Sequence, residues 1–313
     1  MTAGRDGDPG GDPEGDFGGD CEGERETGAR SGNGSGRGFD IEAQIEVESP
    51  PEPDAGSGLG PLSEDGFLGG RLRIRQPVSG YRAATDPVFL AAFTPAVAGE
   101  SVLELGCGAG VAILCLGARV PGLVLHGLEP QPGYAALARA NAAMNAVALT
   151  VHEGDLRRPP AALTALRFDH VIANPPFYPG GAVTAPRDPG RRRAHVEEAG
   201  LGDWIGAGLR RLRDGGRLTL IHRAERLGAI LAALEGRAGS TLVLPLAPRA
   251  GRVAGRVLVR ARKGAAGPLV LAPPLVVHRG ESHGADAGGY GPEAERVLRD
   301  GAGLTRTEVA KCR

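Results

Sequence analysis

The sequence predicts an α/β fold built on a Rossmann-like, doubly wound and mostly parallel sheet. Short β-rich runs alternate with amphipathic helical segments from residue 71 onward, and a glycine-rich turn joins the first of these runs to a helix. Acidic residues recur where the next runs end. Such alternation is typical of doubly wound sheets, which bind ligands beyond the carboxyl ends of their strands. A hydrophobic content of 41% is ample for a sizeable core.

Seven β-rich runs are the predicted strands of this sheet. They cover residues 101–105, 123–129, 149–153, 168–173, 217–222, 241–246 and 257–262. The last two follow each other with a short connection, so we expect an antiparallel edge. Amphipathic segments at 132–144 and 203–213 predict helices, and Gly215-Gly216 is expected to end the second one.

The charge of the chain is divided unequally along its length. Residues 1–66 hold 17 Asp and Glu against 4 Arg, a net charge of −13, whereas residues 67–313 carry a net charge of +12. The first part is rich in Gly, Pro, Asp and Glu, and it lacks the apolar residues that would offset the entropy of ordering. We expect a disordered acidic tail at 1–66 and one folded domain at 67–313.

The sequence lacks several signals that would place the protein in another class. It has no basic and apolar leader of a signal peptide and no run of about 18 apolar residues, so we expect a cytoplasmic protein without a membrane span. The four cysteines, at 21, 107, 115 and 312, form no CxxC pair, so no metal site is predicted. We expect a monomer.

The glycine-rich turn lies in the segment "VLELGCGAGV", at residues 102–111. Glycines there let the backbone turn sharply and approach a ligand, while the following helix presents its N-terminus. A dinucleotide fingerprint would need glycine at Val111, and the lysine of a P-loop is absent. The remaining pattern, E-x-G-x-G-x-G, resembles the nucleotide loop of S-adenosylmethionine-dependent methyltransferases, and a plain glycine-rich turn from strand to helix is the alternative for this motif alone. The pattern nominates Glu104, Gly106, Cys107, Gly108 and Gly110 as cofactor-binding residues.

Two acidic residues lie at the carboxyl ends of the next two predicted strands. Glu129 ends the segment "LHGLE", where a carboxylate can accept hydrogen bonds from both hydroxyls of a ribose. Asp155 follows in "HEGDL", where it could accept from an adenine amino group. A single acidic residue at a strand end is usually a solvated turn residue, but three features spaced in this way favour a nucleoside site.

The fourth predicted strand ends in the segment "FDHVIANPPFYPGG". It delivers an amide, two prolines and an aromatic ring to the edge of the sheet, as Asn174, Pro175, Pro176 and Phe177. The prolines stiffen the turn because each ring locks φ near −65° and restricts the preceding residue. We therefore predict that this segment forms part of the site.

Taken together, the segments "ELGCGAG", "LEP", "EGD" and "NPPF" resemble class I S-adenosylmethionine-dependent methyltransferases that modify amino nitrogens. The surrounding segments "IRQPVSGYRAATDPVFLAA" and "RAHVEEAGLGDWI" resemble the bacterial tRNA1(Val) (adenine-37-N6)-methyltransferase family in particular. The resemblance covers about residues 67–304. It implies S-adenosylmethionine as cofactor and methyl transfer to N6 of an adenine, in a tRNA beside the anticodon.

The resemblance also implies roles for individual residues. The side-chain oxygen of Asn174 and the carbonyl of Pro175 would hold the two N–H groups of the target amine, and Phe177 would stack on a flipped-out base. The chain has only two lysines, so a nucleic-acid surface must consist of arginine. The run Arg191, Arg192 and Arg193 is our candidate for contacts with phosphates.

Three alternatives share some of these features. Ribosomal guanine-N2 methyltransferases also use NPPF, and release-factor methyltransferases use the same kind of motif on a glutamine N5. The latter carry a helical N-terminal domain, which residues 1–66 cannot form. A binding module without catalysis is the third alternative, and the presence of Gly106, Gly108, Glu129 and Asn174 argues against it.

Overall fold

The structure is a computed structural model that describes residues 58–79, 82–176, 200–280 and 289–304. All of these belong to one compact unit, residues 50–313. The candidate residues Phe177, Arg191, Arg192 and Arg193 and the tail up to residue 57 lie outside the described residues.

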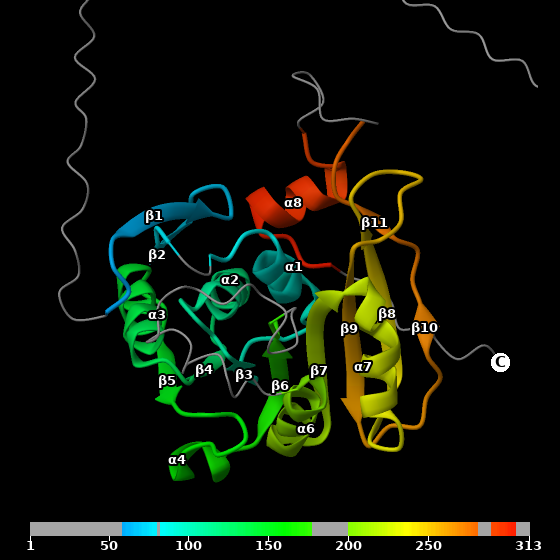
Figure 1. Cartoon of the computed structure of the whole chain (residues 1–313), viewed down its shortest axis with the longest axis horizontal. Coiled ribbons are helices and arrows are strands. Elements are labelled where there is room, and N and C mark those ends of the chain that lie inside the picture. The colour runs from blue at the N-terminus through cyan, green and yellow to red at the C-terminus, as the bar shows by residue number, and fades with distance from the viewer. Residues whose placement is uncertain (1–57, 80–81, 177–199, 281–288, 305–313) are drawn as a thin grey trace, which may run out of the picture. The chain divides into compact units, whose positions relative to one another are not determined.

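A nine-stranded sheet forms the centre of the described part (Figure 1), in the order β10-β8-β9-β7-β6-β3-β4-β5 with β11 beside β8. Strands β3 to β7 are parallel to one another, whereas β9 runs antiparallel to both β7 and β8. The strands are β3 (Ser101–Leu105), β4 (Val124–Glu129), β5 (Leu149–Glu153), β6 (Phe168–Ala173), β7 (Leu212–Arg223), β8 (Ala238–Ala247), β9 (Arg256–Lys263), β10 (Val270–Leu271) and β11 (Leu275–Val276). The predicted parallel sheet with an antiparallel edge is therefore confirmed.

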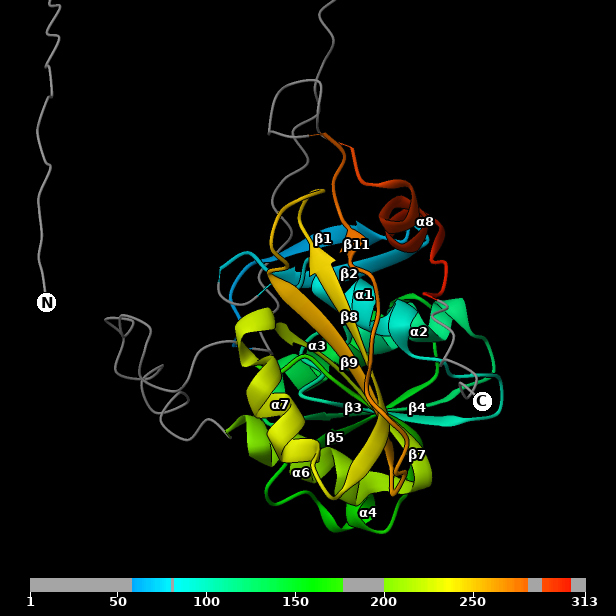
Figure 2. The same ribbon diagram turned by 90° about the vertical axis from the view of Figure 1, so that its right-hand side faces the viewer.

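Helices cover both faces of this sheet (Figure 2). One apolar cluster joins the sheet to α1 (Asp86–Phe93), α2 (Val111–Arg119), α3 (Pro132–Met144) and α8 (Pro292–Asp300). A second cluster joins the other face to α4 (Ala161–Thr164), α6 (Leu201–Arg211) and α7 (Leu227–Leu234), which follows the short turn η1 (Ala224–Arg226). Because both faces are buried, the central strands are apolar on successive residues, as Val102 and Leu103 are.

The structure differs from the predicted elements in two places. The sheet has nine strands in the described residues rather than seven, because β10 and β11 are only two residues long and leave no pattern in the sequence. Helix α6 ends at Arg211 rather than at Gly215-Gly216. These glycines lie inside β7, where Gly215 has φ of +76° and the register shifts relative to β6.

A β-hairpin precedes the main sheet and was not predicted. Its strands β1 (Leu62–Phe67) and β2 (Leu72–Pro77) pair antiparallel. Asn141 of α3 holds the hairpin by accepting a hydrogen bond from the backbone N–H of Arg75 at 2.9 Å and donating one to its carbonyl at 3.0 Å. Since β1 begins at Leu62, residues 62–66 are strand, and the expected boundary of the tail at residue 66 is too late.

The strand register brings the carboxyl ends of four parallel strands together. Leu105 at the end of β3 pairs with Leu128 of β4 on one side and with Ala173 of β6 on the other. Glu129 pairs with Glu153, the last residue of β5. The segments that follow these strands therefore meet at one edge of the sheet. None of the described helices is long and apolar enough to span a membrane.

Candidate functional site

The glycine loop connects β3 to α2 at the centre of this edge. Gly106, Gly108 and Gly110 have φ of +62°, +53° and +86°, a backbone region that side-chain-bearing residues seldom adopt. The backbone N–H of Gly110 donates to the carbonyl of Cys107 at 2.8 Å and closes the turn. Gly110 then serves as the N-cap of α2. The loop therefore places the N-terminus of α2 at the sheet edge.

Gly106 and Gly108 differ in their surroundings, although both have positive φ. A Cβ added to Gly106 would collide with the ring of Trp204, whereas one added to Gly108 would meet no described atom within 4 Å. Trp204 lies on α6 and is 9% exposed. Within the described residues its indole N–H has no hydrogen-bond partner. The first glycine is thus needed for packing, whereas the second borders open space that a ligand can fill.

Glu104 precedes the loop in β3 and binds the helix that follows the loop. It is the fourth residue of β3, is 3% exposed, and accepts a hydrogen bond from the backbone N–H of Ile113 in the first turn of α2 at 2.9 Å. Burial raises its pKa well above the usual value; the Ile113 hydrogen bond opposes this rise, and the nearby charge of Glu129 adds to it. The predicted cofactor residue Glu104 therefore orders the N-terminus of α2.

Glu129 is the last residue of β4, and it is held at the loop by backbone donors. Its Oε2 accepts from the N–H of Gly108 at 2.9 Å, and its Oε1 accepts from the N–H of Gln131 at 3.0 Å. It is 4% exposed, and burial raises its pKa while both hydrogen bonds lower it. Each carboxylate oxygen can accept a further hydrogen bond, so the group is oriented for hydroxyl donors.

Cys107 lies within the loop, but its side chain points away from the sheet edge. The thiol packs against Gly127 of β4, where an added Cβ would lie 2.7 Å from the sulfur. Burial raises the pKa of this thiol well above its ordinary value, and the charges of Glu104 and Glu129 raise it further. Cys107 can therefore contribute only its backbone to a ligand and is not a nucleophile.

Asp155 follows β5 beside Glu129, because the backbone N–H of Gly154 donates to the carbonyl of Glu129 at 3.0 Å. Its carboxylate accepts from the backbone N–H of Arg157 and pairs with the guanidinium of the same residue, both at 2.7 Å. The side-chain hydrogen bond from Arg157 is the main cause of a lowered pKa, so Asp155 is ionised at neutral pH. A ligand amine would share this carboxylate with Arg157.

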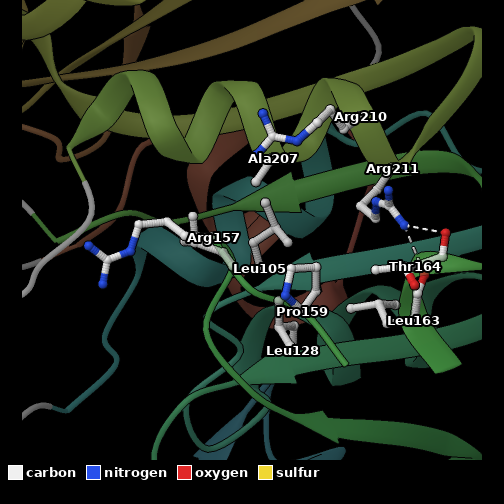
Figure 3. A pocket seen from close by; sticks show the side chains of 10 residues that line it. Leu105, Leu128, Arg157, Pro159, Leu163, Thr164, Ala207, Arg210 and Arg211 are labelled. Atoms are coloured by element: carbon white, nitrogen blue, oxygen red, sulfur yellow. Dashed lines mark hydrogen bonds between the residues drawn. The ribbon is translucent and has the colours of Figure 1, made fainter. Parts of the chain in front are cut away.

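A cavity of about 200 Å³ lies behind the Asp155 turn, between α4 and α6. In Figure 3 leucine side chains form its floor, and Arg157, Arg210 and Arg211 lie around it. Arg211 is fixed there by hydrogen bonds to the carbonyls of Leu163 and Thr164. The residues that line the cavity include none of the predicted cofactor residues, so it is a neighbour of the candidate site and not its centre.

The acceptor segment Asn174-Pro175-Pro176 begins directly after Ala173, whose partner in the sheet is Leu105. Asn174 is half-buried, Pro175 is buried and Pro176 is exposed. Asn174 follows β6, and Gly106 follows the neighbouring strand β3. The amide of Asn174 therefore lies beside the glycine loop. Of the predicted site residues, the structure brings together Glu104, Gly106, Gly108, Gly110, Glu129, Asp155, Asn174, Pro175 and Pro176 at one edge.

Three residues at this edge were not predicted from the sequence. Trp204 packs on Gly106, and Asn141 donates to the carbonyl of Ala109 in the glycine loop at 2.9 Å. His222, near the end of β7, is buried in the strand that pairs with β6. Among the described residues, no cluster of three or more His, Cys, Asp or Glu side chains could hold a metal ion.

Comparison with known proteins assigns the family. The profile of the methyltransferase small domain matches residues 84–228. A tRNA1(Val) (adenine(37)-N6)-methyltransferase from Porphyromonas gingivalis is 32% identical over 176 residues, which cover 53% of this chain and 68% of that protein. The chain belongs to the same methyltransferase family as this P. gingivalis relative. A Cronobacter sakazakii protein of the same description is 27% identical over 205 residues, covering 64% of this chain and 82% of its own.

Other relatives share the methyltransferase core. A release factor glutamine methyltransferase from Geobacter sulfurreducens is 34% identical over 104 residues, but these cover only 33% of this chain and 36% of the relative. A crystal structure of a predicted O-methyltransferase from Agrobacterium tumefaciens has a TM-score of 0.57 and 28% identity, covering 71% of this chain and 99% of that one. The chain is thus a class I S-adenosylmethionine-dependent methyltransferase.

The sheet edge fits this cofactor on its own geometry. Glu129 presents carboxylate oxygens that backbone donors already orient, as recognition of ribose hydroxyls requires. Beside it, the open space at Gly108 admits a ligand close to the backbone. When bound, S-adenosylmethionine supplies an electrophilic methyl group.

Proposed function

We propose that this methyltransferase modifies the exocyclic N6 of an adenine in tRNA. The adenine lies beside the anticodon of a valine tRNA. The observation that carries the proposal is the position of Asn174, which follows β6 immediately beside the glycine loop that follows β3. The names of the P. gingivalis and C. sakazakii relatives support the choice of substrate.

The reaction requires a weak nucleophile to be held in line with the methyl group. An exocyclic amine is unreactive because its lone pair is delocalised into the ring of the base. Asn174 Oδ1 and the Pro175 carbonyl would each accept a hydrogen bond from one N–H group of this amine. The two hydrogen bonds would draw the nitrogen toward tetrahedral geometry and direct its lone pair at the methyl carbon. The two proline rings restrict the backbone on which both acceptors lie. Positioning of this kind can supply much of the rate acceleration.

The charge of the chain and the nature of the acceptors support RNA as the substrate. Residues 67–313 carry a net charge of +12, which suits a polyanion. A base must leave its stack to reach the acceptors, and this requires least energy in a single-stranded loop such as the anticodon loop. A planar base also matches the predicted stacking on Phe177 better than a flexible glutamine does.

The test is a methyl-transfer assay with purified protein, tritiated S-adenosylmethionine and total tRNA. We expect the label in N6-methyladenine after digestion to nucleosides and chromatography. Label in N2-methylguanine of ribosomal RNA would instead support guanine methylation, and label in protein alone would contradict an RNA substrate. A tRNA fraction depleted of valine isoacceptors is the matched control, and it should lose most of the label.

A further inference from the structure

Two asparagines one helical turn apart, Asn141 in α3 and Asn145 at its C-cap, bind the β1–β2 hairpin in the same way. Asn145 accepts a hydrogen bond of 3.0 Å from the backbone N–H of Arg73 and donates one of 2.7 Å to its carbonyl. Asn141 makes the same pair of bonds to Arg75, at 2.9 and 3.0 Å. Four residues of an α-helix rise about 6 Å and two residues of a strand about 6.8 Å, so the two spacings match. The amides therefore occupy the outer edge of β2, as a neighbouring strand would.

Asn141 differs from Asn145 by one further contact. Its Nδ2 also donates a hydrogen bond of 2.9 Å to the carbonyl of Ala109, the residue between Gly108 and Gly110 in the glycine loop. The remaining side-chain bond of Asn145 goes instead to the carbonyl of Asn141, within the same helical turn. Asn141 is thus the one of these two residues that touches both the hairpin and the glycine loop.

The partners of Asn141 fix the orientation of its fully buried amide. The oxygen faces the N–H of Arg75, and the nitrogen faces two carbonyls, those of Arg75 and Ala109. Exchanging the two ends would set the oxygen against carbonyl oxygens and the nitrogen against an N–H group. The hairpin supplies two of the three partners, so a docked hairpin holds the amide in the orientation that donates to the loop.

The bond to Ala109 fixes one peptide unit of the glycine loop. The N–H of this unit belongs to Gly110 and donates to the carbonyl of Cys107 at 2.8 Å, whereas its carbonyl accepts from Asn141. A peptide unit is planar, so hydrogen bonds at its two opposite ends set the direction of the whole unit. Since Gly110 is the N-cap of α2, Asn141 thereby sets the turn that leads into this helix.

We propose that Asn141 is a positioning residue for S-adenosylmethionine, which couples the docked β1–β2 hairpin to the glycine loop. The hairpin, at residues 62–77, precedes residues 84–228 of the methyltransferase profile, so this link makes a segment outside the matched region part of the cofactor site. Coupling between two sites is reciprocal: a docked hairpin raises the affinity for the cofactor, and bound cofactor disfavours opening of the hairpin by the same factor. The coupling concerns cofactor binding and is independent of the RNA substrate.

Asn141→Ala and Asn145→Ala separate the loop contact from the hairpin contact. Each variant loses one pair of hydrogen bonds to the hairpin, but only Asn141→Ala leaves the Ala109 carbonyl without its donor. We expect Asn141→Ala to weaken S-adenosylmethionine binding by about fivefold to tenfold in calorimetric titration, as the loss of one hydrogen bond to a buried group implies. Asn145→Ala should bind the cofactor within about twofold of wild type, although both variants should melt at a lower temperature. Equal cofactor affinities of the two variants would overturn the proposal.

Hydrogen exchange of the wild-type chain tests the coupling even if Asn141→Ala does not fold. Saturating S-adenosylmethionine should slow exchange of the β2 amides, that of Arg75 included, by about fivefold or more. The amides of β10, at the far edge of the sheet, are the internal control and should not change. Asn145→Ala should keep the slowing in β2, whereas Asn141→Ala should lose it. An unchanged β2 in the wild type, a slowing that β10 shares, or one that persists in Asn141→Ala would overturn the proposal.

Discussion

The backbone N–H of Gly108 donates a hydrogen bond of 2.9 Å to Oε2 of Glu129. This bond joins the glycine loop after β3 to the carboxyl end of β4, so both halves of the candidate cofactor site are fixed relative to each other before a ligand binds. A preorganised site loses less conformational entropy on binding. Glu129 therefore orders the loop, and we propose that it also accepts hydrogen bonds from the ribose hydroxyls.

Glu129→Ala should weaken S-adenosylmethionine binding by roughly tenfold or more, since hydrogen bonds to a charged group contribute about 1.5–3 kcal/mol. Glu129→Gln should not restore the affinity, because one end of the amide is a donor that would face the N–H of Gly108 or Gln131. Calorimetric titration measures both variants. Wild-type affinity in a folded Glu129→Ala protein would remove this residue from the site.

Gly106→Ala and Gly108→Ala should separate folding from cofactor binding. Both place a methyl group at positive φ, a strain of about 1–2 kcal/mol. Only Gly106→Ala collides with Trp204, so it should lower the melting temperature clearly more than Gly108→Ala does. Gly108→Ala meets none of the described residues, yet it fills the space assigned to the cofactor. It should fold but bind S-adenosylmethionine poorly.

Thermal melts without ligand and fluorescence titrations with cofactor distinguish the two glycine variants. Trp204 is the only tryptophan of the chain and lies against the loop, so its emission should report binding. Trp204→Leu combined with Gly106→Ala should recover part of the lost stability by relieving the collision. A Gly108→Ala protein that binds cofactor as wild type does would show that the ligand lies elsewhere.

The fold was predictable because its signals are local. Alternating β-rich and helical segments identified strands β3 to β9 of the main sheet, and the glycine loop identified the turn into α2. The β1–β2 hairpin was not predicted, although β2 alternates apolar and charged residues at 72–75; β1 has no comparable alternation. The hairpin is held by Asn141 and Asn145, which follow it by more than 60 residues. The two-residue strands β10 and β11 are too short to show a periodicity.

The site was predictable only in part, for a related reason. Glu129 ends one strand and Asn174 follows another directly, so the sequence alone indicates the sheet edge where they lie. The orientation of a side chain is not encoded in this way: Cys107 belongs to the loop, but its thiol packs on Gly127. His222 and Trp204 reach the site through strand register and helix packing, which no local motif reveals.

Asn174→Ala should affect turnover rather than cofactor binding. Asn174 is assigned to the target amine, so its loss should lower kcat by about a hundredfold or more while the affinity for S-adenosylmethionine stays within a few fold. Asn145→Ala is the matched control, because Asn145 binds the backbone of Arg73 in the hairpin and not the site. Near wild-type methyl transfer by Asn174→Ala would exclude this residue from the mechanism.

Glu104 should make the stability of the protein depend on pH in a direction that burial determines. Its pKa is raised in the folded state by burial in the first place, whereas in the unfolded chain the carboxyl returns to about 4.5. Below that value both states are protonated, and the wild type keeps its full stability. As the pH rises above about 4.5, the unfolded state loses its proton first, and the folded state is disfavoured until its own pKa is passed.

Comparison with Glu104→Gln isolates this contribution from all other titrating groups. The amide oxygen can still accept from Ile113, but the side chain no longer ionises. The free energy of unfolding of wild type relative to the variant should therefore fall as the pH rises from 4.5, by at most about 1.4 kcal/mol per pH unit. Denaturant unfolding of the cofactor-free proteins between pH 4 and 8 measures this difference. A constant difference, or one that favours the wild type at higher pH, would contradict the assignment of Glu104 as a buried group with a raised pKa.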